Sequence, residues 1–151
     1  MKKIALGTDH AGFKLKEAVK AHLSSKGYQV KDFGTDNEDP VDYPDFVRPA
    51  AESVAGKGCD LGIVFGGSGN GEATVANKVR GIRCSLCYDE WSSLMAKEHG
   101  NANVIALGGR VVSEENAIHL VETWLNAAFQ GGRHQRRIDK IEKPTGESGQ
   151  G

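Results

Sequence analysis

Short apolar runs alternate with longer amphipathic stretches along almost the whole chain, and this alternation constrains the fold most. The apolar runs are predicted to be strands, at residues 3–8, 28–33, 60–65, 82–88 and 103–107. The other stretches have the apolar spacing of helices, at residues 12–26, 42–55, 69–79, 89–99, 113–129 and 133–141. Strands that alternate with helices along a chain form a parallel sheet with helices on both faces.

The length of 151 residues fits one domain. The sequence predicts a single three-layer α/β/α Rossmann-like (flavodoxin-like) domain with a five-stranded parallel sheet, over residues 1–143. A basic helix from about residue 133 would close this domain. The Gly/Ser-rich residues 144–151 are expected to form a disordered tail.

The charge and the hydropathy pattern narrow the kinds of partner. A net charge of −1 gives no sign of nucleic acid or a membrane surface as partner. No apolar run approaches the roughly 20 residues that a membrane-spanning helix needs. We therefore expect a cytoplasmic protein that binds neither nucleic acid nor membrane.

The three cysteines are Cys59, Cys84 and Cys87, and their odd number argues against a disulfide framework. Cys84 and Cys87 form a C-x-x-C pattern inside the predicted strand 82–88, which looks buried. Residues three apart on a strand point to opposite faces, so these thiols could not share a metal ion. We expect structural cysteines and no metal site.

A glycine-rich run from Gly66 to Glu72, GGSGNGE, follows a predicted strand and opens a predicted helix. Such turns aim backbone N–H groups at an anion. The run has neither the Lys-Ser/Thr ending of a phosphate-binding P-loop nor the G-x-G-x-x-G spacing of dinucleotide sites. It ends instead in a carboxylate, which suits a reaction that creates an anion by removing a proton. The plainer alternatives are a tight glycine turn and a Glu72 that only stabilises the helix dipole.

Ligands of parallel sheets bind outside the carboxyl ends of the strands, where the strand order switches direction. In the common five-stranded winding this switch lies between the first and third strands. The loops there would be residues 9–12 and residues 66–72, so two loops far apart in sequence would share one crevice. Asp9 and His10 are therefore candidate site residues, although an N-capping Asp followed by a surface His is the alternative.

Other candidates lie outside these loops. His99 closes a predicted helix, where a cation also favours the helix dipole. Arg133 and Arg137 are four residues apart and share one helix face, and paired guanidinium groups bind phosphate well. The alternative is a solvated basic terminus. Tyr43 is uninformative by itself.

Several motifs together resemble ribose-5-phosphate isomerase B, over about residues 2–142. They are GTDHAG at residues 7–12, DYP at 42–44, the glycine-rich run at 66–72, ANK at 76–78, NVIALGGR at 103–110 and GRHQ-x-R at 132–137. The wider family also holds subunits of galactose-6-phosphate isomerase and enzymes that act on allose 6-phosphate.

The resemblance implies an aldose–ketose isomerase of the pentose phosphate pathway. It would interconvert ribose 5-phosphate and ribulose 5-phosphate through a cis-enediolate, without metal or other cofactor. One branch of the family has a Cys as base at the position of Gly66, and the other has a Glu at the position of Glu72. This chain is similar to the second branch. Alternatives are a hexose 6-phosphate isomerase, acting on allose or galactose 6-phosphate, and a non-catalytic sugar-phosphate-binding module.

The resemblance also implies a role for each site residue. Glu72 would be the base, and Ser68 with the amides of Gly67, Gly69 and Gly71 would hold the oxyanion. His99 would help to open the sugar ring, Asp9 would position or deprotonate hydroxyls, and Tyr43 would line the pocket. The phosphate would be bound by His10, Arg110, Arg133 and Arg137.

In this family the site lies between two subunits, which implies a homodimer or a tetramer. His99, Arg133 and Arg137 would come from the partner of the chain that supplies Glu72. The chain departs from the family in one place, since Gly100 follows His99 where the family usually has Asn. Asn101 could replace that Asn as a sugar ligand, but a shift of one residue redirects a helical side chain by about 100°. The change leaves room for a six-carbon sugar.

Overall fold

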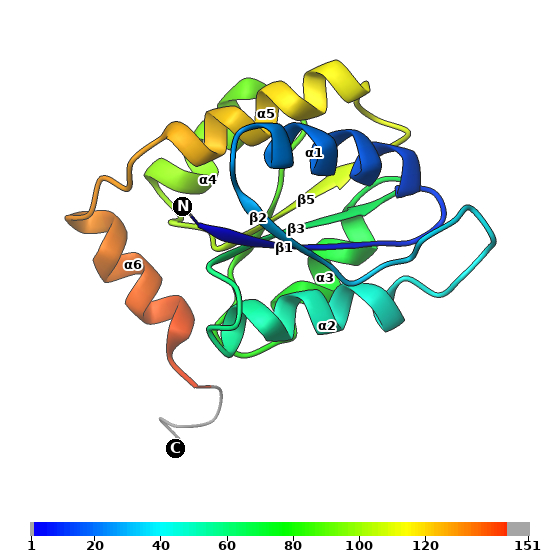
Figure 1. The fold of residues 1–151 in the computed structure, drawn as a ribbon. Helices are drawn as coiled ribbons and strands as arrows, with labels where there is room; N and C mark the ends of the chain where they lie inside the picture. Colours follow the sequence, from blue (N-terminus) through cyan, green and yellow to red (C-terminus); the bar gives the residue numbers. More distant parts are fainter. Residues whose placement is uncertain (1, 145–151) are drawn as a thin grey trace.

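The computed structural model describes residues 2–144 and contains the predicted alternation of strands and helices (Figure 1). The strands are β1 (Lys3–Thr8), β2 (Gln29–Asp32), β3 (Leu61–Gly66), β4 (Cys84–Leu86) and β5 (Val104–Gly108). The helices are α1 (Phe13–Ser25), α2 (Pro44–Ala55), α3 (Asn70–Asn77), α4 (Glu90–Glu98), α5 (Glu114–Asn126) and α6 (Arg133–Glu142). All the strands pair in parallel in one sheet, which confirms the predicted α/β class.

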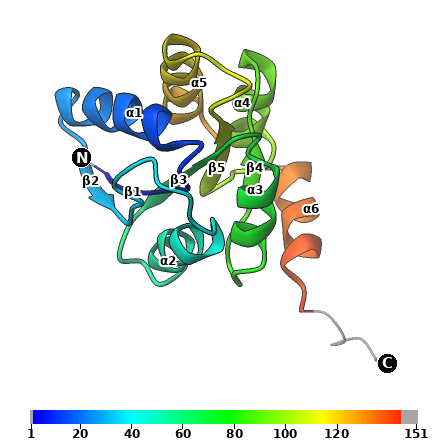
Figure 2. The same ribbon diagram turned by 90° about the vertical axis from the view of Figure 1, so that its right-hand side faces the viewer.

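Helices cover both faces of the sheet, as Figures 1 and 2 show. Helices α1, α4 and α5 pack on one face, and α2 and α3 pack on the other. Successive strand residues alternate between the two cores, so Ile4 and Leu6 face α1 and α5 whereas Ala5 faces α2. The apolar runs are thus buried on both sides, as a parallel sheet requires.

The strand order is β2-β1-β3-β5-β4, so the last two strands are exchanged relative to the common winding. The switch between β1 and β3 is where the sequence predicts it. Strand β5 is fully buried and apolar, so it lies inside the sheet. The strand expected at residues 82–88 is present but shorter, and the expectation that it is buried is wrong. Only β4 forms a strand there, and its residues are half-buried because β4 is the edge strand of the sheet.

The cysteines lie as the strand periodicity predicts. Cys87 belongs to the core beneath α4 and α5, whereas Cys84 packs against the core beneath α2 and α3. All three cysteines are free thiols. Burial raises the pKa of the Cys87 thiol to about 11, so this thiol is unreactive at neutral pH.

Helix α6 stands outside the layers, next to the β4 edge of the sheet (Figure 2). It follows α5, which ends at Asn126 rather than at 129 because Ala127 is already extended. Apart from Pro144, the predicted tail 144–151 lies outside the described residues. Within residues 2–144 no helix has both the length and the apolar character needed to cross a bilayer.

Candidate active site

The loops that follow β1 and β3 meet at one pocket, as their adjacent strands require. The pocket has a volume of about 430 Å³. Its lining comes from four separate segments: Asp9, His10, Ala11, Tyr43, Gly67, Ser68, Gly71, Glu72, Arg110 and Val111. The predicted convergence of residues 9–12 with residues 66–72 is confirmed.

The glycine-rich loop is held by the segment after β5. The Gly109 N–H donates to the Gly66 carbonyl at 2.7 Å, and the Arg110 N–H donates to the Gly67 carbonyl at 2.9 Å. Gly69 is the N-cap of α3, and its φ of 88° is a left-handed conformation that suits glycine. These contacts fix the loop so that the first turn of α3 opens into the pocket.

Glu72 lies in the first turn of α3, with only 3 % of its surface exposed. Burial raises the pKa of its carboxyl group. The N–H groups of Glu72 and Gly69 oppose this rise, and the negative charge of Asp9 adds to it. A carboxylate made more basic by a dry environment is suited to take a proton from carbon.

The carboxylate of Glu72 occupies the space that a side chain at position 66 would need. A Cβ atom built on Gly66 would lie 2.1 Å from Cδ and 2.2 Å from both carboxylate oxygens of Glu72. The φ of Gly66 is not in the left-handed region, so its backbone does not itself demand glycine. A side chain at position 66 and this position of the Glu72 carboxylate therefore exclude each other.

Residues with free hydrogen-bond donors line the pocket together with Glu72. The N–H groups of Gly67, Ser68 and Gly71 have no acceptor among the described residues. The Ser68 Oγ accepts from the Asn70 N–H at 3.2 Å and from Asn70 Nδ2 at 3.3 Å, so its own O–H remains free to donate. This group of donors can stabilise an oxyanion formed next to Glu72.

Asp9 and His10 line the pocket from the loop that follows β1. Asp9 is buried, and its Oδ1 accepts from the Gly12 N–H at 3.0 Å, so it also holds the turn before α1. The Nδ1 of His10 accepts from the Val41 N–H at 3.1 Å. In neutral His10 the proton is therefore on Nε2, which is left as a donor.

Tyr43 and Arg110 border the same pocket from two other segments. A Cβ atom on Gly71 would lie 2.6 Å from Cζ of Tyr43, so the absence of a side chain at Gly71 lets the phenol ring approach the loop. Arg110 is exposed beside Gly67 and supplies a cation at the pocket.

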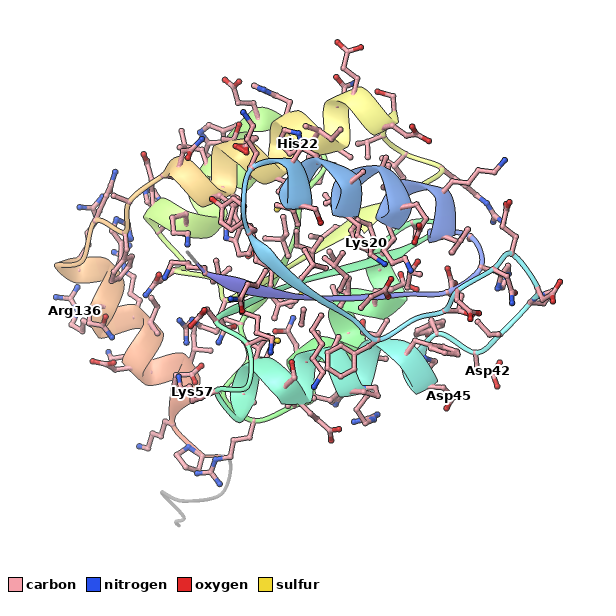
Figure 3. The ribbon with its side chains drawn as sticks, in the orientation of Figure 1. Lys20, His22, Asp42, Asp45, Lys57 and Arg136 are labelled. Atoms are coloured by element: carbon pink, nitrogen blue, oxygen red, sulfur yellow. The ribbon has the colours of Figure 1, made fainter. Side chains whose placement is uncertain are left out.

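The remaining predicted residues lie elsewhere in the same chain. His99 ends α4, Asn101 follows it with a φ of 43°, and Arg133 and Arg137 are on α6. None of these four lines the pocket. Figure 1 shows α6 on the side where β1 begins, whereas the pocket loops follow the other ends of the strands. In Figure 3, Arg136 of α6 lies far from Asp42 and Asp45, which flank Tyr43.

The comparisons with known proteins give the family. The family model described as "Ribose/Galactose Isomerase" matches residues 4–141. The chain belongs to the ribose/galactose isomerase family. One relative in this family is ribose-5-phosphate isomerase B of Escherichia coli, which is 44% identical over 141 residues. That match covers 93% of this chain and 95% of the relative.

Solved structures of the ribose/galactose isomerase family share the fold. Ribose-5-phosphate isomerase B of Clostridium thermocellum superposes with a TM-score of 0.92 at 48% identity, and the match covers 93% of this chain and 95% of that one. The enzyme of Mycoplasma genitalium, solved with ribulose-5-phosphate bound, gives a TM-score of 0.90 at 41% identity. That match covers 93% of this chain and 94% of that one.

The structure adds two residues that the sequence reasoning missed. Val111 is an exposed apolar residue at the pocket, and nothing in the local pattern indicates this. Arg83 donates from Nε to the Gly100 carbonyl at 3.0 Å and from Nη2 to the Asn101 carbonyl at 2.8 Å. Arg83 thereby holds the segment after His99. The two residues that it contacts are 17 and 18 positions away in the sequence, and no local pattern indicates such a contact.

The described residues contain no group of three or more His, Cys, Asp or Glu side chains that could hold a metal ion.

Proposed function

We propose that this protein is an aldose–ketose isomerase that interconverts D-ribose 5-phosphate and D-ribulose 5-phosphate through a cis-enediolate. The observation that carries the proposal is Glu72, a buried carboxylate with a raised pKa at the wall of a pocket lined by anion-stabilising donors. A pure phosphate-binding module gains nothing from a carboxylate at this position. The relatives named ribose-5-phosphate isomerase B support the substrate.

The reaction starts with opening of the furanose ring. The bond between C1 and O4 breaks, His99 gives a proton to O4, and the O1 hydroxyl loses its proton to Asp9. This produces the open-chain aldehyde, with O1 as its carbonyl oxygen. The buried Asp9 carboxylate is at the pocket for this step.

Isomerisation follows at C1 and C2. Glu72 removes the proton from C2, the C1–C2 double bond forms, and O1 becomes the enediolate oxygen. The Ser68 hydroxyl and the free N–H groups of Gly67 and Gly71 stabilise that charge. Glu72 then returns its proton to C1, and the proton of O2 passes to O1, which leaves the ketose.

The site is shared between two subunits of a homodimer in this proposal. Within one chain, Glu72 lies at the pocket, whereas Arg133 and Arg137 are on α6 next to the β4 edge and His99 stacks on this helix (Figure 2). The proposal therefore takes these two groups from different chains. Two guanidinium groups one helical turn apart suit a phosphate ester, and His10 and Arg110 would complete its binding from the first chain.

Subunit mixing tests the shared site. Arg137→Ala should mainly weaken binding of the phosphate ester, so at ribose 5-phosphate concentrations far below KM the Glu72→Gln and Arg137→Ala homodimers are each expected to be nearly inactive. After unfolding and refolding of an equal mixture, half of the dimers carry one unaltered site, so about a quarter of the wild-type activity should return. If no activity returns, Glu72 and Arg137 act from the same chain and the shared site is wrong.

The substrate is tested by comparing kcat/KM for ribose 5-phosphate, allose 6-phosphate and galactose 6-phosphate under the same conditions. We expect ribose 5-phosphate to be preferred. A hexose 6-phosphate isomerase is the second candidate, because Gly100 supplies no side chain beside His99. A higher kcat/KM for either hexose phosphate would select that candidate, and no turnover of any sugar phosphate would overturn the isomerase proposal.

A further inference from the structure

Helix α6 is attached to the end of α4 at two points. At its C-terminal end, Glu142 Oε1 lies 3.4 Å from Nη1 of Arg83, the residue that also binds the carbonyls after His99. At its N-terminal end, the ring of His134 stacks on the ring of His99. The Arg83 side chain and the stacked rings of His134 and His99 thus connect the end of α4 to the helix that carries Arg133 and Arg137.

The two imidazole rings are close and nearly parallel. Their centroids are 4.0 Å apart and their planes differ by 18°. Only 5 % of the surface of His134 is exposed, and its buried Nε2 has no hydrogen-bond partner among the described residues. A buried imidazole that uses this nitrogen for no hydrogen bond is packed as a flat ring rather than held as a polar anchor.

The surroundings of His134 favour its neutral form. Burial lowers the pKa of this imidazole, and His99, Arg133 and Arg137 lower it further because each carries or can carry positive charge. Two protonated rings stacked at this distance would repel each other. His134 therefore packs against His99 as a ring that favours its uncharged form.

A stacked ring restricts how His99 can turn. His99 is only the C-cap of α4, with no hydrogen bond from its ring among the described residues, so the backbone alone does not set its ring plane. A displacement of about 1 Å at a proton donor can cost on the order of 100-fold in rate. A fixed orientation of the His99 ring should therefore speed proton transfer to the ring oxygen of the sugar.

We propose that His134 is a positioning residue for His99: it is the flat ring that fixes the plane in which His99 meets the sugar ring oxygen in the neighbouring subunit. This inference rests on the proposed function, and in particular on His99 as the group that opens the ring. His134 itself does not touch the substrate.

The two reaction directions separate this role from a general structural one. Ribose 5-phosphate is a closed furanose and needs ring opening. Ribulose 5-phosphate has its O5 esterified and cannot close to a furanose, and the aldehyde formed from it can close after release without the enzyme. A defect in His99 should therefore slow the reaction from ribose 5-phosphate far more than the reaction from ribulose 5-phosphate.

The experiment measures initial rates in both directions for His134→Ala, His134→Phe and Ile138→Ala. Ile138 is the other buried residue of α6, so its truncation loosens the helix without removing the stacked ring. We expect His134→Ala to lose about 10- to 100-fold of kcat from ribose 5-phosphate and less than about 3-fold from ribulose 5-phosphate. His134→Phe keeps a flat ring and should stay within about 3-fold in both directions. Ile138→Ala should raise KM in both directions alike.

Proton NMR of the His99 ring gives a readout that does not depend on activity. The stacked ring should shift the His99 ring protons upfield in the wild type and in His134→Phe, and this shift should disappear in His134→Ala. Equal losses in both directions for His134→Ala, matching those of Ile138→Ala, would overturn the inference, as would an unchanged His99 spectrum. If the wild type isomerises neither sugar phosphate, the proposed function fails, and the NMR comparison still decides whether His134 fixes His99.

Discussion

Replacement of Gly66 by Ala should inactivate the protein through Glu72 rather than through the backbone. The new Cβ would lie 2.1 Å from Cδ of Glu72, whereas ordinary contact begins at 3.4 Å. The three atoms nearest to this Cβ all belong to the Glu72 carboxylate, so the carboxylate must leave its place. Loss of a positioned base lowers kcat by about 10²- to 10⁴-fold. Overpacking of this kind costs about 1–3 kcal/mol of stability.

A double-mutant cycle identifies the cause. In a Glu72→Ala background the three atoms nearest to the new Cβ are removed, so Gly66→Ala should change the free energy of unfolding by less than about 0.5 kcal/mol. The coupling energy between the two sites should therefore be about 1–3 kcal/mol. Gly58→Ala is a matched control, because its Cβ would meet only Ser53 at 3.4 Å and its φ is outside the left-handed region.

Urea unfolding at pH 7.5 and initial rates with ribose 5-phosphate measure the two effects. The interpretation is refuted if Gly66→Ala keeps wild-type kcat, or if its cost in stability is the same with and without the Glu72 side chain. Either result would mean that the Glu72 carboxylate does not occupy the space beside Gly66.

Three further predictions concern the site and its support. Because burial raises the pKa of Glu72, the folded state disfavours the ionised carboxylate, and Glu72→Gln should have a higher Tm than the wild type at pH 8. This difference in Tm should disappear as the pH falls toward 4.5, and a difference that stays constant with pH in thermal unfolding would contradict the prediction. Lys16 is buried, and its Nζ donates to Asp32 at 2.7 Å and to the Thr35 carbonyl at 2.9 Å, so Lys16→Met should lower the free energy of unfolding in urea by about 3 kcal/mol. The half-exposed Lys20 donates to the same Asp32 at 3.0 Å, and Lys20→Met should cost below about 1 kcal/mol. Similar costs for the two variants would refute the role of burial. Ser68→Ala should lower kcat by about 10²-fold with little change in KM, and a change confined to KM would assign Ser68 to substrate binding.

Local pattern was enough to predict the elements and the layers. The apolar runs and the amphipathic stretches carry their periods in the sequence, and the crevice between β1 and β3 follows from the switch in strand order. The exchange of β4 and β5 was not predicted, because it depends on a comparison between two strands rather than on either one alone. The fully buried, apolar β5 lies inside the sheet, and the shorter, half-buried β4 lies at its edge.

The residues around Glu72 were predicted because they are concentrated in two loops, at residues 9–12 and 66–72. The overlap between a Cβ atom at position 66 and the Glu72 carboxylate was not predicted, since it depends on where the Glu72 side chain lies rather than on the spacing of residues in the sequence. The contacts of Arg83 and the stack of His134 on His99 join segments far apart in sequence, and ordinary surface residues have the same local pattern. The roles of His99, Arg133 and Arg137 remain predictions that need a second chain.

The most direct test of the central claim is the kcat of Glu72→Gln with ribose 5-phosphate, measured together with the affinity for the same sugar phosphate. Gln keeps the size of the side chain and removes its ability to accept a proton from carbon. We predict that kcat falls by about 10²- to 10⁴-fold while the dissociation constant changes by less than about 3-fold. A Glu72→Gln variant that turns over at close to the wild-type rate would show that Glu72 is not the base.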